Sequence, residues 1–243
     1  MTARGPELFI SDLHLSPHEP GTFRRFRDFL AGPARSAARL TLLGDLFDAW
    51  AGDDDLADPF NAAVVRELRA LVAAGVPVDF VAGNRDFLVG ADFAAASGAS
   101  LLPDPCLREV AGIATLLTHG DTLCTDDADY QRFRAEVRSP AWRAEFLARP
   151  LAERKRLIEQ LRQRSETEKQ GKAMRLMDVN AHAVAALLRE YAAASLIHGH
   201  THRQARHAID VAGRACVRWA LGDWTGERGT ALACTTEGCR FLA

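Results

Sequence analysis

Five short apolar segments of this chain each end in side chains that can bind a metal or act on a substrate. The segments are "FIS" at 9–11, "TLL" at 41–43, "FVA" at 80–82, "LLT" at 116–118 and "LI" at 196–197. The residues that follow them are Asp12-Leu13-His14, Gly44-Asp45, Gly83-Asn84-Arg85-Asp86, His119-Gly120-Asp121 and His198-Gly199-His200-Thr201-His202. Open α/β sheets bind their ligands at the carboxyl ends of the strands. If the five segments are strands, the chain folds so that these side chains share one rim.

The first 120 residues alternate short apolar segments with helical ones. Residues 7–11, 39–43 and 78–82 predict buried strands, and residues 106–118 predict a hairpin. Residues 61–75 have apolar positions at helical spacing and end in a glycine, which favours a helix stop. This alternation predicts an α/β fold with a parallel or mixed sheet.

The amino-acid composition changes between residues 121 and 194. Glycine almost disappears, and Arg, Glu, Ala and Leu predominate, which predicts helices. Strands return at 195–197, 205–210, 215–221 and 230–236. We therefore expect a core of residues 1–120 and 195–243 that is interrupted by a helical insertion, 121–194. The acidic segment "AGDDDLADPF" at 51–60 is expected to be a solvated loop.

The composition excludes several classes of protein. With 48% hydrophobic and 26% charged residues, the chain reads as a globular domain with a sizeable core. A formal net charge of −2 gives no indication of nucleic-acid binding. Residues 1–15 lack the apolar region of a signal peptide, and no segment approaches the roughly 20 apolar residues of a membrane span. The five cysteines form no CxxC pair and are expected to be reduced thiols in a cytosolic protein.

The candidate ligands at the predicted rim are too many for one metal ion of ordinary coordination. They are Asp12, His14, Asp45, Asn84, His119, His200 and His202. Each motif alone is also common in turns or at surfaces, but the complete set is improbable by chance. A histidine-rich site without thiols favours Mn²⁺, Zn²⁺ or Fe over Ca²⁺ or Mg²⁺. Two such ions about 4 Å apart activate water and clamp the oxygens of a phosphoryl group, which predicts hydrolysis of a phosphoester or phosphoanhydride.

The motif order D-x-H, GD, GN, H and GHxH resembles the calcineurin-like metallophosphoesterase superfamily. The resemblance implies an αββα sandwich and two metal positions. One position would use Asp12, His14, Asp45 and His202, and the other Asp45, Asn84, His119 and His200, so that Asp45 bridges them. His198 falls outside this ligand set and would either pack behind the site or act directly.

Arg85 departs from the superfamily pattern. Members that act on phosphomonoesters and phosphoproteins usually have a histidine after the asparagine, and it protonates the leaving group. An arginine stays protonated and cannot serve as that acid, although its guanidinium binds phosphate well. This difference favours a phosphoanhydride substrate, whose leaving group departs unaided.

Longer strings resemble a narrower family, the UDP-2,3-diacylglucosamine hydrolases of lipid A biosynthesis in Gram-negative bacteria. They are "FISDLHL", "LLGDLFDAW", "VAGNRDFLVG", "THGDTLCTDDADYQRFR", "MDVN" and "LIHGHTHR", between about residues 7 and 225. The resemblance implies cleavage of the substrate pyrophosphate to UMP and 2,3-diacylglucosamine 1-phosphate (lipid X), with two Mn²⁺ ions. A hydroxide held by both ions would attack the α-phosphorus. No nucleic acid or protein partner is implied.

By position, the family's substrate contacts would be Asn84, Arg85, Asp127, Ser165, Lys169, Lys172 and His200, with Asn84 and Arg85 also catalytic. The stretch "RSETEKQGKAMR" around Lys169 departs from family members that are richer in Ser and Asn there. Lys172 has the stronger physical case, because its ammonium group would neutralise phosphate charge beyond the reach of the metals.

The segment 139–162 places large apolar side chains among many arginines. It is either a pair of helices packed on the core with a solvated basic face, or a lid whose apolar inner surface shelters two acyl chains. In the second case, which is compatible with the first, the basic outer surface meets an anionic membrane leaflet. The resemblance then places the protein in the cytoplasm, peripherally bound to the inner membrane.

Two other functions compete with this prediction. A broader metallophosphoesterase would act on nucleotides or dinucleoside polyphosphates, but such soluble substrates would not require the insertion. A non-catalytic scaffold of the same fold typically lacks metal ligands, whereas every expected ligand is present here.

Overall fold

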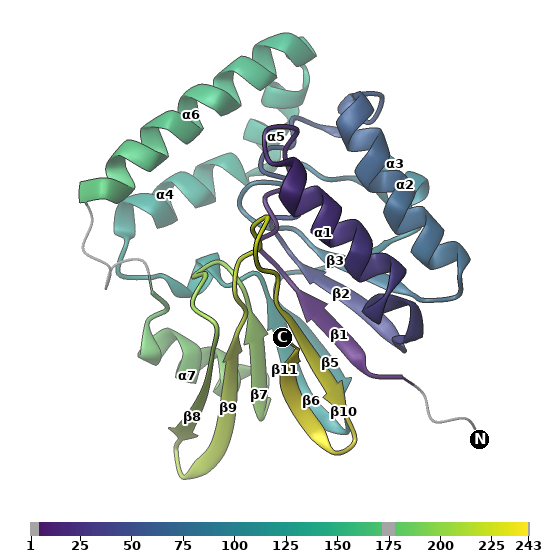
Figure 1. The fold of residues 1–243 in the computed structure, drawn as a ribbon. Helices are drawn as coiled ribbons and strands as arrows, with labels where there is room; N and C mark the ends of the chain where they lie inside the picture. The colour runs from purple at the N-terminus through teal and green to yellow at the C-terminus, as the bar shows by residue number, and fades with distance from the viewer. Residues whose placement is uncertain (1–4, 172–177, 243) are drawn as a thin grey trace.

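The computed structural model describes residues 5–171 and 178–242, with side chains described for 5–163 and 178–242. One sheet comprises β1 (Glu7–Ile10), β2 (Arg39–Leu43), β3 (Val78–Val81), β4 (Ser100–Leu102), β10 (Ala231–Thr235) and β11 (Gly238–Leu242). The other comprises β5 (Cys106–Val110), β6 (Ile113–Thr118), β7 (Ser195–His198), β8 (Ala205–Val211) and β9 (Arg214–Ala220). Their orders are β11-β10-β1-β2-β3-β4 and β5-β6-β7-β9-β8, and Figure 1 labels all of these strands except β4. β1, β2 and β3 run parallel, and so do β6, β7 and β9.

The two sheets pack face to face because their central strands are apolar on both sides. Phe9, Leu43 and Val81 of the first sheet share a buried cluster with Leu117 and Ile197 of the second. Successive strand residues point to opposite faces, so the neighbours of these residues point outward and meet helices.

Helices cover the outer face of each sheet. The first is covered by α1 (Pro20–Ala31), α2 (Pro59–Ala73) and α3 (Ala91–Ser97), and the second by α7 (Ala181–Glu190). Short 3-10 turns lie at Pro33–Ser36, Asp53–Asp55 and Asp121–Leu123. The fold is the predicted αββα sandwich. The sequence analysis did not predict four of the observed elements, namely the edge strands β4 and β11 and the helices α1 and α3.

A disulfide joins Cys234 and Cys239. The two residues face each other in the hairpin of β10 and β11, with their Cα atoms 4.0 Å apart. The expectation that the five cysteines are reduced is therefore wrong for this pair, because the hairpin brings together two thiols that form no recognisable sequence motif.

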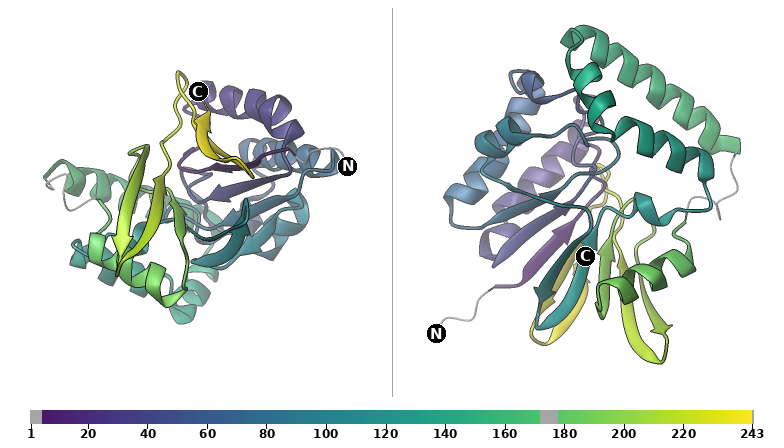
Figure 2. Two further views of the ribbon diagram at one scale, coloured as in Figure 1. Left: turned by 90° about the horizontal axis from the view of Figure 1, so that it is seen from below. Right: turned by 180° about the vertical axis from the view of Figure 1, so that it is seen from behind.

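Three helices of the predicted insertion stand beyond the end of the sheets at which β1, β2 and β3 finish. They are α4 (Ala128–Val137), α5 (Pro140–Leu147) and α6 (Leu151–Gly171), as Figures 1 and 2 show. The later helix α7 instead packs on the second sheet, where Val184 and Leu188 contact the cluster that includes Leu196. None of the described helices is long and apolar enough to cross a membrane.

The acidic segment 51–60 binds α6, so the expectation of a solvated loop is wrong. Arg154 of α6 is buried, donates a hydrogen bond to the carbonyl oxygen of Ala51 and pairs with Asp54. Lys155 Nζ lies 2.7 Å from Asp55 Oδ1. Basic groups on the insertion thus neutralise the acidic run, which its composition alone could not indicate.

Apolar contacts reinforce this docking. Phe146 is buried in the main core, and Trp142 and Leu157 pack against the same cluster. Leu147 and Leu161 remain exposed, each at 39%. The large apolar residues of 139–162 therefore divide between core packing and an exposed surface. The packing of these helices on the core is observed, and the lid over acyl chains stays a prediction.

Replacing Arg154 with methionine is expected to lower the free energy of unfolding by about 1–3 kcal/mol, because the Ala51 carbonyl loses its donor in a buried place. Urea denaturation measures the change. The matched control is Arg149→Gln, which removes only exposed ion pairs to Glu145 and Glu153 and should have little effect. Equal losses in the two variants would contradict the docking role of Arg154.

Candidate active site

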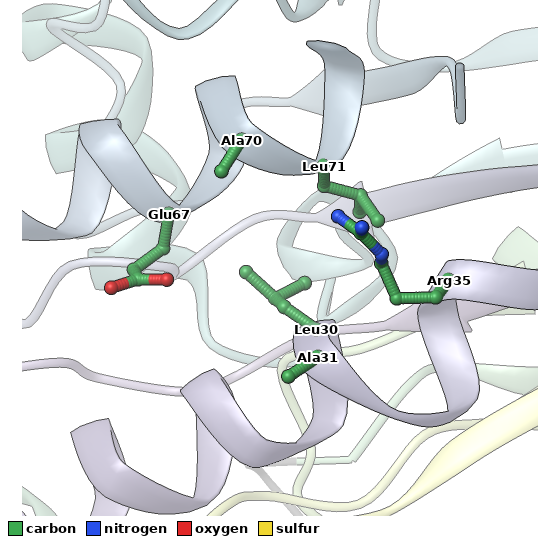
Figure 3. Close-up of a pocket in the computed structure, with 6 residues that line it drawn as sticks. All are labelled: Leu30, Ala31, Arg35, Glu67, Ala70 and Leu71. Atoms are coloured by element: carbon green, nitrogen blue, oxygen red, sulfur yellow. The ribbon is translucent and has the colours of Figure 1, made fainter. Parts of the chain in front are cut away.

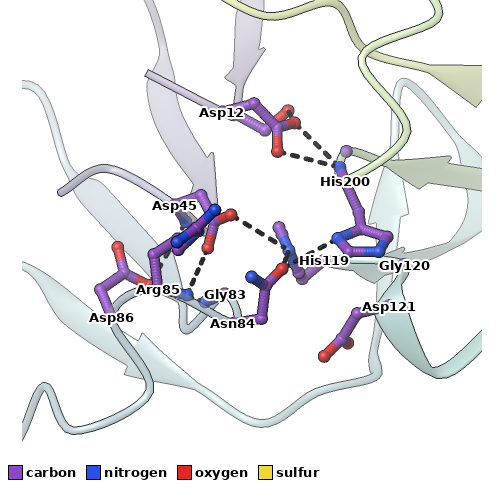
Figure 4. A network of polar contacts seen from close by, with 12 residues as sticks. Asp12, Asp45, Gly83, Asn84, Arg85, Asp86, His119, Gly120, Asp121 and His200 are labelled. Atoms are coloured by element: carbon purple, nitrogen blue, oxygen red, sulfur yellow. Dashed lines mark hydrogen bonds and ion pairs between the residues drawn. The ribbon is translucent and has the colours of Figure 1, made fainter. Parts of the chain in front are cut away.

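The predicted ligands gather at the carboxyl ends of five strands, as Figure 4 shows for the central ones. Asp12, Asp45 and Asn84 follow β1, β2 and β3, and His119 and His200 follow β6 and β7. The rim is thus built from both sheets, and loops far apart in the sequence meet there.

The backbone at the rim is unusual. The residues in the left-handed region include five of the seven predicted ligands, at φ values of 55° for Asp12, 46° for His14, 54° for Asp45, 67° for His200 and 57° for His202. A non-glycine residue in this region costs on the order of 1 kcal/mol. Such conformations persist only where the surrounding structure enforces them, and they cluster at functional sites.

One group of candidate metal ligands surrounds Asp12. The Nε2 atoms of His14 and His202 face each other at 3.3 Å, and His202 Nε2 lies 3.4 Å from Asp12 Oδ1. Ser11 Oγ and the backbone N–H of His200 donate to the Asp12 carboxylate and hold it in place. Asp12, His14 and His202 therefore offer converging ligand atoms within 4.8 Å of one another.

A second group surrounds Asn84. Its Oδ1 lies 2.9 Å from His119 Nε2 and 2.9 Å from His200 Nδ1. Asp45 Oδ2 lies 3.7 Å from His119 Nε2 and 3.8 Å from His14 Nε2, so one carboxylate oxygen lies between the two groups. This is the position that a bridging ligand needs, although Asp12 also converges with Asp45 and His119.

The charges at the rim suit divalent cations. Burial lowers the pKa of His119, but the carboxylates of Asp45, Asp12 and Asp121 outweigh burial and raise it to about 9. Burial lowers the pKa of His200 to about 4, which leaves this imidazole neutral, the form that binds metals. The set of imidazole nitrogens with carboxylate and amide oxygens fits a two-metal site.

Comparisons with known proteins agree with this geometry. The family model described as calcineurin-like phosphoesterase matches residues 6–204. A UDP-2,3-diacylglucosamine hydrolase of Aromatoleum aromaticum is 56% identical over 217 residues, which cover 89% of this chain and 88% of the relative. A UDP-2,3-diacylglucosamine hydrolase of Bordetella pertussis is 50% identical over 226 residues, or 92% and 87% of the two chains.

This chain belongs to the UDP-2,3-diacylglucosamine hydrolase family of calcineurin-like phosphoesterases. It is a metal-dependent hydrolase. Among solved structures, an archaeal phosphodiesterase matches at 13% identity and a TM-score of 0.49, covering 98% of each chain, a similarity that adds nothing to the assignment.

Asp86 organises the rim of this hydrolase, although it was not among the predicted metal ligands. The fully buried carboxylate accepts hydrogen bonds from the backbone N–H groups of Gly83 and Leu46, both at 2.8 Å, and of Asp45 at 3.3 Å. Burial and the neighbouring Asp45 carboxylate raise the pKa of Asp86 to about 7. One side chain thus fixes the two loops that carry the bridging aspartate and the asparagine.

Asp121 connects the insertion to the hydrolase site. Its carboxylate accepts hydrogen bonds from the Tyr130 hydroxyl at 2.9 Å and from Arg134 Nε at 2.7 Å, both on α4. The Tyr130 ring stacks on His200 with a centroid distance of 5.9 Å. In the sequence, only the position of Asp121 directly after His119-Gly120 indicated that it lies near the site. Its partners on α4 could not be predicted, because they depend on how the insertion folds back.

His198 packs behind the rim, the first of its two predicted alternatives. It is fully buried, with Nδ1 2.8 Å from the carbonyl oxygen of Gly199 and Nε2 3.3 Å from Arg218 NH1. Its neighbours His200 and His202 turn toward Asn84 and Asp12 instead.

Only some of the residues predicted to contact the substrate lie at the rim. The backbone N–H of Arg85 donates to Asp45 Oδ1 at 2.8 Å, which places Arg85 at the rim. Asp127 caps the start of α4 by accepting from the Tyr130 N–H. Ser165 and Lys169 lie on α6 where side chains are outside the described part, and Lys172 lies outside the described residues.

A separate cavity of about 320 Å³ lies between α1 and α2 and is shown in Figure 3. Its six lining residues are Leu30, Ala31, Arg35, Glu67, Ala70 and Leu71. Glu67 is paired with Arg27, and none of the rim residues reaches this place, so the cavity offers no second catalytic constellation.

Gly83→Ala is expected to weaken binding of divalent metal at least about tenfold and to destabilise the fold by about 1–3 kcal/mol. A Cβ atom at this position would overlap the side chain and backbone N of Asp45. Calorimetric titration and urea denaturation measure the two effects. The control is Gly226→Ala, whose added atom would meet Gly21 Cα at an ordinary 3.4 Å. Unchanged metal binding in the Gly83 variant would contradict the tight approach of the two loops.

Proposed function

We propose that this chain hydrolyses the pyrophosphate bond of UDP-2,3-diacylglucosamine and releases UMP and 2,3-diacylglucosamine 1-phosphate. The observation that carries the proposal is Asp45 Oδ2 lying between two groups of histidine and carboxylate ligands. The substrate follows from the name of relatives that are 46–56% identical over most of the chain.

In this proposal each group of ligands binds one Mn²⁺ ion. Asp12, His14, Asp45 and His202 hold the first ion, and Asp45, Asn84, His119 and His200 hold the second. When bound, the ions supply a nucleophilic water at neutral pH and offset the negative charge of the phosphoryl oxygens. The α-phosphorus of the uridine side is the site of attack.

Arg85 then binds and orients the phosphate groups without donating a proton. Its backbone N–H holds Asp45, so the same residue fixes the bridging carboxylate and presents a permanent positive charge beside it. The leaving group is a phosphate monoester, which departs without an acid. The side-chain oxygen of Asn84 lies 2.9 Å from His119 Nε2 and 2.9 Å from His200 Nδ1, so the three atoms converge on the place proposed for the second ion.

The insertion supplies the acyl-chain surface in this proposal. Phe133 of α4, Leu147 of α5 and Leu161 of α6 account for half of the large exposed hydrophobic residues in the described part of the chain. In this proposal these three side chains contribute to the surface that contacts the acyl chains. Asp127, Ser165, Lys169 and Lys172 contact the substrate, and basic residues of the insertion hold the protein peripherally at the cytoplasmic face of the inner membrane.

Incubation with UDP-2,3-diacylglucosamine and Mn²⁺ in ¹⁸O-labelled water is expected to release UMP that carries the label, because attack occurs at the α-phosphorus. Chelation of the metal should abolish release, and His119→Asn should reduce it at least about a hundredfold. The control is His182→Asn, an exposed histidine of α7, which should be fully active. Label found in the sugar phosphate instead of UMP would show that attack occurs at the other phosphorus. Cleavage of dinucleoside polyphosphates without cleavage of UDP-2,3-diacylglucosamine would contradict the proposed substrate.

Arg85→His is expected to raise turnover of an alkyl phosphate about tenfold or more, because a histidine can protonate an alkoxide leaving group. Pyrophosphate cleavage should fall because the guanidinium that binds the phosphate groups is lost, but it should remain measurable because the metal ligands are intact. Steady-state rates with both substrates, compared with those of Arg85→Lys, test this difference. If neither rate changes in Arg85→His, the missing acid does not determine the substrate class.

A further inference from the structure

His14 and His202 have the same arrangement of polar groups around their rings. Their Nε2 atoms face each other across the proposed first metal position at 3.3 Å. Their Nδ1 atoms point away from it, each toward a carboxylate that is not a proposed ligand. His14 Nδ1 lies 3.9 Å from Asp48 Oδ1, and His202 Nδ1 lies 3.9 Å from Asp223 Oδ2.

Each of these carboxylates uses its second oxygen to bind an arginine. Arg162 NH2 lies 2.5 Å from Asp48 Oδ2, and Arg228 NH2 lies 2.6 Å from Asp223 Oδ1. Both aspartates therefore stand between an arginine and a histidine. The two arginines come from different parts of the fold, since Arg162 belongs to α6 of the insertion and Arg228 to the loop before β10.

The chemistry of imidazole gives this arrangement a role. A neutral histidine that binds a metal through Nε2 must have its proton on Nδ1, and that N–H needs an acceptor. Carboxylates commonly accept this hydrogen bond, and losing one typically weakens metal binding by about 10–100-fold. Asp48 and Asp223 are the carboxylates that these Nδ1 atoms face, at 3.9 Å, which is longer than a direct hydrogen bond. A small shift of either side chain, or one bridging water, completes the contact that selects this tautomer and orients the ring.

We propose that Asp48 and Asp223 are positioning residues for His14 and His202, and that Arg162 makes the first of them depend on the docking of α6. The inference rests on the proposed two-metal site and extends it, because seating of the insertion would then contribute to metal affinity. An exposed ion pair of ordinary strength would instead contribute at most about 1 kcal/mol to stability and nothing to the metals.

Titration of metal-free protein with Mn²⁺, followed by calorimetry and by the electron paramagnetic resonance of free Mn²⁺, tests the proposal. Wild-type protein should bind two ions. Asp48→Asn and Asp223→Asn should each weaken one of the two ions by about 10–100-fold and leave the other unchanged. Urea denaturation of the metal-free variants should match the wild type, which excludes a general loss of structure.

The role of α6 is tested by a matched pair of variants. Arg162→Gln should weaken the same ion as Asp48→Asn, and Arg162→Lys should restore part of the affinity by keeping the charge. Lys155→Gln removes another contact between α6 and the acidic segment, to Asp55 and Asp58, without reaching a histidine, so Mn²⁺ binding should stay at the wild-type level.

Two results would overturn the inference. The first is wild-type Mn²⁺ affinity at both positions in Asp48→Asn, which would leave the proposed hydrolase intact. The second is an equal loss in Arg162→Gln and Lys155→Gln, which would show general loosening of the insertion. Failure of the wild-type protein to bind two ions would instead contradict the proposed function itself.

Discussion

The buried carboxylate of Asp86 accepts backbone hydrogen bonds from the loops after β2 and β3, and the rim depends on this interaction. Hydrogen bonds of this kind matter because backbone N–H groups that lost their acceptor in this buried place would be left unpaired. They draw Gly83 against Asp45 so closely that no side chain fits between them. The first sheet thus presents its bridging aspartate and its asparagine as one unit.

The second sheet joins this unit through His119. Its Nδ1 lies 2.8 Å from the carbonyl oxygen of Leu43, its carbonyl oxygen accepts from the Gly199 N–H at 2.9 Å, and its Nε2 meets Asn84. A single buried histidine therefore contacts the strand ends of both sheets. The inter-sheet apolar core sets the distance between the sheets, and these hydrogen bonds determine which loops meet at the end of that core.

Local patterns predicted the central strands and the gathering of the candidate ligands at one rim. Apolar runs with polar ends predict strands, and ligand residues after each run predict a shared rim. Short edges such as Ser100–Leu102 were missed because they are largely exposed and carry no periodic signal. The structural roles of Asp86, Asp121 and Asp48 were not predicted for a different reason: their partners are backbone groups or residues on helices of the insertion. The docking of α6 on Asp54 and Asp55 also depends on pairing across the fold, which composition cannot reveal.

The left-handed backbone at the ligand residues links catalysis to evolutionary change. Glycine adopts this conformation without steric penalty, so at Asp12, His14 or Asp45 it would relieve the backbone while removing the side chain. Selection for stability alone would favour that replacement, and selection for hydrolysis opposes it. A descendant that no longer needed its ions would therefore tend to accumulate glycine at these positions, and such a pattern in its sequence would mark the loss of the reaction.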